Sequence, residues 1–211
     1  MIVMPQEKSR ELVPAGSHLA ICFRVIDLGT QATPFGPKRQ IMFGFELPDE
    51  HTSDGWQHTI SRKFTYSSDK RSALRGELES WLGRQLTAAD FGRLDLGDML
   101  GRSCTLGIRH DVREGRTFAN VASIMKPPKG VAERLSPTNP AIAFSLADEP
   151  FRIAEFEALP GWLQSMIGRS PEYAAAIRGK AASPMTVGEF ASLATTGERL
   201  RQHLADHEIP F

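Results

Sequence analysis

Large apolar side chains alternate with smaller or polar ones over residues 18–28. A period of two predicts a strand with one buried face. Similar patterns predict strands over 38–47 and 56–66. Two more such runs, 103–112 and 116–125, flank a three-residue connection that contains glycine, as a hairpin requires.

The spacing of apolar residues changes to that of a helix between the third and fourth predicted strands. Ser68-Asp69 can cap a helix over about 70–82, and Gly83 can end it. Its apolar residues form one stripe, which predicts that Trp81 is buried. Residues 87–100 predict a short helix or turn.

Residues 16–130 thus contain three strands, one helix and two more strands. This order predicts a mainly β protein with a five-stranded oligonucleotide-binding barrel (OB-fold), whose helix lies between strands three and four. A small α+β sheet with a covering helix is the alternative. Within either fold, Phe43 and Phe45 share a face with Ile41 and should be buried.

The remaining segments differ from this domain. Residues 1–15 predict a flexible leader, and 131–204 predict a helical extension with linkers. Within the extension, one or two amphipathic helices are expected over 151–167, with a break near Pro160-Gly161. Helices are also expected over 171–179 and 187–204. Residues 205–211 form an acidic tail.

Composition is consistent with a packed protein, because 41% of residues are hydrophobic and 24% are charged. The formal net charge is zero, but residues 1–130 carry +3 and residues 131–211 carry −3. This weak asymmetry is compatible with nucleic-acid binding. Cys22 and Cys104 lie in apolar runs and should be small buried hydrophobes of a reducing cytoplasm. We expect a cytoplasmic protein that does not enter membranes.

Motifs for catalysis or metal binding are not evident. We find no glycine-rich phosphate loop, no His-Glu-x-x-His, no Gly-x-Ser-x-Gly and no metal-ligand cluster. His110 and Asp111 are adjacent on a predicted strand, so their side chains point to opposite faces and cannot act on one substrate. We therefore expect a protein that is not an enzyme and needs no cofactor or metal.

Basic and aromatic residues interleave in the first half of the chain. Single-stranded nucleic acid is bound by stacking of bases on aromatic rings and by cations that follow the phosphates. The predicted DNA-binding residues are Lys38, Arg39, Trp56, Arg62, Lys63, Phe64, Tyr66, Arg109, His110, Arg116 and Phe118. A solvated charged face and buried rings are the alternatives.

The last residues place acids ahead of a proline-stiffened apolar end. Phe211 can fill a pocket while its carboxylate pairs with a basic side chain. Pro210 lowers the entropy lost on docking. The predicted partner-binding residues are Asp206, Glu208, Ile209, Pro210 and Phe211.

This ending resembles the acidic tip of bacterial single-stranded DNA-binding proteins, although His207 interrupts its acids. The resemblance implies recruitment of helicases, nucleases, primosome proteins or recombination proteins. The front of the chain is similar to phage and prophage single-stranded DNA-binding proteins in stretches such as Ile60-Ser-Arg-Lys-Phe-Thr65 and Phe118-Ala-Asn120. That similarity implies a role in phage replication or recombination.

Two functions from different classes remain open. The first is a single-stranded DNA-binding protein that recruits host partners through its tail. The second is an OB-like adaptor or inhibitor that binds host replication or defence proteins and no DNA, which the zero net charge permits. Either could form a homo-oligomer.

Overall fold

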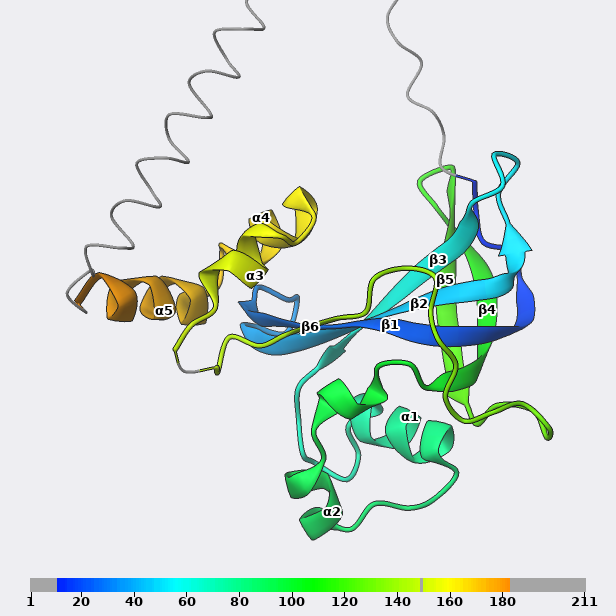
Figure 1. The fold of residues 1–211 in the computed structure, drawn as a ribbon, viewed down its shortest axis with the longest axis horizontal. Coiled ribbons are helices and arrows are strands. Elements are labelled where there is room, and N and C mark those ends of the chain that lie inside the picture. The colour runs from blue at the N-terminus through cyan, green and yellow to red at the C-terminus, as the bar shows by residue number, and fades with distance from the viewer. Residues whose placement is uncertain (1–10, 149, 183–211) are drawn as a thin grey trace, which may run out of the picture.

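The computed structural model describes residues 11–148 and 150–182, and within them the chain is mainly β (Figure 1). Five strands follow one path, in the spatial order β3-β2-β1-β4-β5, and every neighbouring pair is antiparallel. Their bounds are β1 Gly16–Gln31, β2 Lys38–His51, β3 Gln57–Thr65, β4 Ser103–Arg113 and β5 Arg116–Met125. The five strands predicted from alternation are confirmed.

The sheet bends but does not close into a barrel. The first half of β1 pairs with β4 and its second half pairs with β2, so one long strand serves both halves of the sheet. The end strands β3 and β5 approach within 8 Å between Cα atoms, yet no ladder joins them in the described chain. The prediction of a mainly β fold is confirmed, whereas the predicted barrel is an open sheet.

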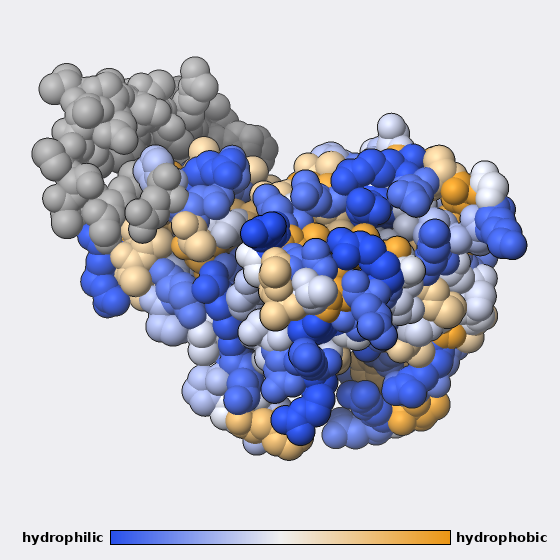
Figure 2. All heavy atoms as spheres, turned by 90° about the horizontal axis from the view of Figure 1, so that it is seen from below, coloured by the Kyte–Doolittle hydropathy of each residue, from blue (hydrophilic) through white to orange (hydrophobic). Residues whose placement is uncertain are grey.

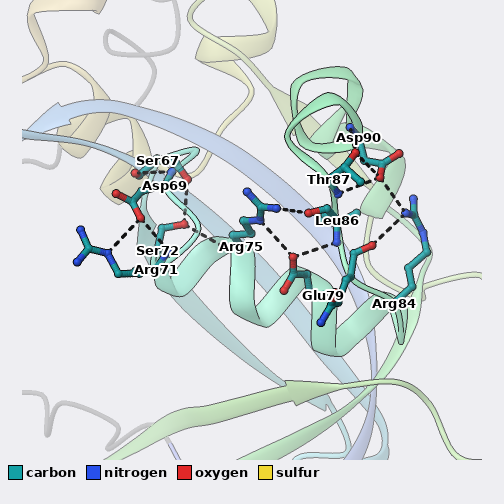
Figure 3. A network of polar contacts seen from close by, with 11 residues as sticks. Ser67, Asp69, Arg71, Ser72, Arg75, Glu79, Arg84, Leu86, Thr87 and Asp90 are labelled. Atoms are coloured by element: carbon teal, nitrogen blue, oxygen red, sulfur yellow. Dashed lines mark hydrogen bonds and ion pairs between the residues drawn. The ribbon is translucent and has the colours of Figure 1, made fainter.

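Helix α1 (Ala73–Leu82) packs near β3 and β5, where closure is missing. Its N-cap is Ser72 rather than the predicted Ser68-Asp69, because the Ser72 hydroxyl accepts a hydrogen bond from the Arg75 N–H. Arg75 donates to Glu79 and to the Leu86 carbonyl (Figure 3).

The predicted turn region forms two short elements, α2 (Ala88–Arg93) and the 3₁₀ helix η1 (Leu96–Met99). A capping box between Thr87 and Asp90 starts α2 (Figure 3). Burial of Phe91 and Met99 attaches both elements to the core beneath the sheet.

The main core lies between the concave side of the sheet and α1. Phe43, Phe45 and Trp81 are buried there in mutual ring contact, as predicted. The Trp81 indole also donates to the Ser103 carbonyl, at 2.9 Å, so its polar group is satisfied. Cys22 and Cys104 are buried in the same core.

The extension packs on the opposite side of the long strands and forms a second core. Strand β6 (Ile142–Phe144), which the sequence pattern did not predict, pairs in parallel with β1. Helices α3 (Ile153–Glu157), α4 (Gly161–Ile167) and α5 (Pro171–Ala182) follow, and the predicted break at Pro160-Gly161 is confirmed. Buried residues of β1, β2, β6, α3 and α4 meet there.

Hydrogen bonds attach this helical unit to β1. Glu172 of α5 accepts from the backbone N–H and the hydroxyl of Thr30, at 2.8 and 2.6 Å. Gly29 permits this approach, because a β-carbon there would lie 2.5 Å from the Ser170 side chain and the backbone φ of Gly29 is +67°. Residues 131–182 therefore belong to the same folded unit as the first five strands, as far as the chain is described.

The predicted flexible leader, residues 1–15, is folded at its C-terminal end. Val13 is buried in the main core, and its carbonyl lies 2.8 Å from Nε2 of His110. Folded structure therefore begins ahead of residue 16.

The face that carries α1 and α2 is mainly hydrophilic, with small separate apolar areas (Figure 2). None of the helices in the described residues has the length and apolar character needed to cross a membrane.

Candidate nucleic-acid interface

A groove is lined by residues of the sheet and of helix α4. Helix α4 lies on the side of β1 opposite α1 and α2 (Figure 1). The groove consists of two adjoining cavities of about 570 and 420 Å³, which share Ser61 and Trp162. We call the larger cavity, which Phe23, Phe118 and Trp162 line, the aromatic lobe. The smaller, lined by Lys63, Arg109 and Arg113 among others, is the basic lobe.

Alternation along β3 separates Arg62 and Phe64 from Ser61 and Lys63. Phe64 and Arg62 point toward α1: Phe64 is buried, and Arg62 pairs with Glu77 at 2.8 Å. Ser61 and Lys63 are exposed and border the groove, because neighbouring residues of a strand point to opposite faces.

The basic lobe gathers cations from two strands. Lys63 comes from β3, while Arg109 and Arg113 come from β4 in the β4–β5 hairpin. Asp111 lies between the two arginines, 3.4 Å from Arg109 and 3.9 Å from Arg113. Such exposed pairs are weak and can exchange for phosphate contacts.

Two aromatic rings are accessible in the aromatic lobe. Phe118 of β5 is 44% exposed and Trp162 of α4 is 50% exposed. Half-exposed rings on a groove wall suit base stacking, because part of the ring surface is open to a base. Trp162 was not predicted as a site residue; it lies in the segment 151–167, for which the sequence predicted amphipathic helices.

Arg24 of β1 lines the floor of the aromatic lobe. A bulge between Cys22 and Arg24 places it opposite Gly44 on β2, which in turn lies opposite Ser61 on β3. Gly44 leaves room for it, because a β-carbon on Gly44 would lie 2.9 Å from the Arg24 β-carbon. Burial lowers the pKa of the Arg24 guanidinium below its ordinary value.

Four of the predicted residues, Arg62, Lys63, Arg109 and Phe118, thus line the groove. Phe64 is 4% exposed and contacts Phe43, so its ring cannot stack on a base, and the prediction for Phe64 is wrong. Arg62 is also drawn away from solvent by its pair with Glu77, although it borders the basic lobe.

Arg39 and Tyr66 lie in a different cavity, of about 400 Å³, bordered by η1 and β6. Arg39 there donates to the buried Asp27, at 2.5 Å, and this hydrogen bond raises the pKa of Arg39. The lining of this cavity also includes Asp95 and Asp148, so its carboxylates outnumber its cations. Such a cavity disfavours phosphate.

The other four predicted residues lie outside the groove lining. Lys38 is exposed at the start of β2, and Trp56, 76% exposed, precedes β3. His110 contacts the Val13 carbonyl, and Arg116 pairs with Arg113 across the hairpin ladder. Whether they touch nucleic acid stays a prediction. The predicted docking residues Asp206, Glu208, Ile209, Pro210 and Phe211 lie outside the described residues.

Within residues 11–148 and 150–182, no group of three or more His, Cys, Asp or Glu side chains is arranged to hold a metal ion. The groove instead offers cations, hydroxyl and amide groups and two open rings, which suit binding. No protein-family model matches the chain, and the curated proteins contain no match to it.

Proposed function

We propose that the chain binds single-stranded nucleic acid in this groove, with DNA as the expected ligand. The observation that carries the proposal is the convergence of the cations Lys63, Arg109 and Arg113 with the half-exposed rings of Phe118 and Trp162. Bases stack on open rings whatever their sequence, while cations neutralise the phosphates.

The place of the groove supports the same function. The path β3-β2-β1-β4-β5, with α1 between β3 and β4, has the order of an OB-fold opened between β3 and β5. OB-folds bind oligonucleotides on the face of their second and third strands and on the loop between the fourth and fifth. The basic lobe lies across β2, β3 and the β4–β5 hairpin.

We further propose that the C-terminal tail recruits partner proteins of DNA metabolism, on the basis of its sequence alone. An adaptor that binds no DNA remains the competing function, and the net charge of zero is compatible with it.

Anisotropy titration of a labelled 30-nucleotide oligo-dT at two salt concentrations tests the proposal. Binding should be tighter than to duplex DNA and should weaken with salt. The double variant Lys63→Gln/Arg109→Gln should bind more weakly and with a smaller salt slope, by about 0.7 per lost phosphate contact.

A matched control removes the same charge outside the groove, at the exposed Lys129 and Arg71. This control should bind as the native protein does. Absence of oligo-dT binding at low salt would contradict the proposal and favour the adaptor.

A further inference from the structure

Arg24 differs from other arginines of the described chain in having a partly buried guanidinium without a carboxylate partner. Its Nε is buried and has no hydrogen-bond partner. Arg39 and Arg152 each have acidic partners, which raise their pKa values. The Nε of Arg102 is also buried without a hydrogen-bond partner, but Arg102 lies 3.9 Å from the carboxylate of Glu133. The missing carboxylate partner therefore distinguishes Arg24 and leaves its charge available to an anion.

The local backbone is built to hold this side chain. The bulge in β1 alters the direction of the side chains at Phe23 and Arg24, and the guanidinium lies 4.8 Å from the centre of the Phe23 ring. Gly44 provides the space beside it. Gly44 and the Phe23 ring therefore hold the Arg24 side chain in place, with its guanidinium in the lining of the aromatic lobe.

The surroundings of Arg24 suit an anion. Ser61 brings a hydroxyl to the same lobe, and Phe118 and Trp162 form part of its lining. Asn139 also lines the lobe, and its side-chain amide donates to the buried carboxylate of Glu46, at 2.8 Å. The acidic residue in this lining, Glu11, directs its carboxylate to the N–H and hydroxyl of Ser53.

We propose that Arg24 is a phosphate-binding residue, which holds one phosphate group of the strand at the floor of the aromatic lobe while adjacent bases stack on Phe118 and Trp162. This inference rests on the proposed function. The two terminal nitrogens of the guanidinium can contact two phosphate oxygens at once.

Two measurements test the site. In the first, Arg24→Gln should weaken oligo-dT binding about 10- to 100-fold and lower its salt slope by about 0.7, because one charged hydrogen-bonded contact is lost. The oligo-dT affinity of Arg24→Lys should lie between those of the native protein and Arg24→Gln, since lysine keeps the charge but lacks the planar guanidinium. Arg71→Gln, 92% exposed at its side chain, is the matched control.

The second measurement uses the native protein, so it does not depend on the folding of a variant. The Nε–Hε NMR signal of Arg24, assigned by its loss in Arg24→Lys or by through-bond correlation, should shift saturably on addition of oligo-dT. Inorganic pyrophosphate, as a free source of the same group, should shift it at much higher concentration.

The outcomes separate the two claims. Suppose that the native protein binds oligo-dT. If the Arg24 signal then does not shift, or if a folded Arg24→Gln keeps the native affinity and salt slope, the phosphate site is overturned and the proposed function remains. Failure of the native protein to bind oligo-dT overturns the proposed function. In that case a saturable pyrophosphate shift would support an anion site at Arg24, and no shift would remove it as well.

Discussion

Arg62 of β3 donates to the carboxylate of Glu77 on α1 at 2.8 Å. The other oxygen of Glu77 accepts from the backbone N–H of Ile124 on β5, at 2.7 Å. A helix carboxylate thus connects the two end strands, which no ladder joins in the described chain.

This connection predicts a loss of stability in Glu77→Ala. The substitution leaves the partly buried Arg62 unpaired and the Ile124 N–H without an acceptor, which should lower the free energy of unfolding by about 1–3 kcal/mol. Urea denaturation measures it. Glu157→Ala, exposed in α3, should change stability by less than about 0.5 kcal/mol. Equal effects of the two substitutions would show that Glu77 does not connect the strands.

Gly44 should not tolerate a methyl group. In Gly44→Ala the new β-carbon would meet the Arg24 β-carbon at 2.9 Å and the Phe23 ring at 3.5 Å. Neither can move without moving β1, so we expect a loss of about 1–3 kcal/mol in denaturant unfolding. Gly76→Ala is the control: it meets nothing within 4 Å in α1 and should stabilise the helix by about 0.5–1 kcal/mol. An unchanged free energy of unfolding in Gly44→Ala would contradict the close approach of β1 to Gly44.

The two cysteines should be inert in the folded protein. Burial raises the pKa of Cys22 to about 12 and that of Cys104 well above its ordinary value. Thiolate is therefore scarce, and a thiol reagent at pH 8 should label neither residue until urea is added. Because both pKa values are raised on folding, their contribution lowers stability as pH rises above about 8.5. Rapid labelling of native protein would contradict this burial.

Glu172 should make the attachment of α5 sensitive to acid. Burial raises its pKa, but hydrogen bonds from Thr30 outweigh burial and leave the pKa lowered. A lowered pKa gives a contribution to stability that is present above about pH 4.3 and is lost as pH falls through the folded-state value. Glu172→Gln should therefore destabilise the protein at pH 7, and the difference from native should shrink in acid. A difference that is constant with pH would contradict the prediction.

Trp162 and Phe118 should each contribute to binding of single strands. Replacing either ring by alanine removes a stacking surface and should weaken oligo-dT binding by about 1–3 kcal/mol per lost stacked base. Tryptophan fluorescence quenching on DNA addition should fall in Trp162→Ala. Trp56→Ala, outside the groove and 76% exposed, is the comparison. Weaker binding in Trp56→Ala alone would place the interface at the loop before β3.

Local sequence pattern determined the five long strands, α1, the helix break at Pro160-Gly161 and the burial of Phe43, Phe45 and Trp81. These features depend on periodicity and on backbone chemistry, which a short segment carries by itself. Alternation also implies that Lys63 and Phe64 face opposite ways, so the prediction that both bind DNA did not use all that the strand pattern contains.

Tertiary structure decided which face met solvent and which distant residues came together. Phe64 is buried because its face of β3 meets α1, and Arg39 is withdrawn because Asp27 lies beside it. The three-residue β6 exists through its pairing with β1, and Trp162 borders the groove because α4 docks on the second core. Such contacts join residues far apart in the chain, so the spacing of apolar residues within a short segment cannot predict them.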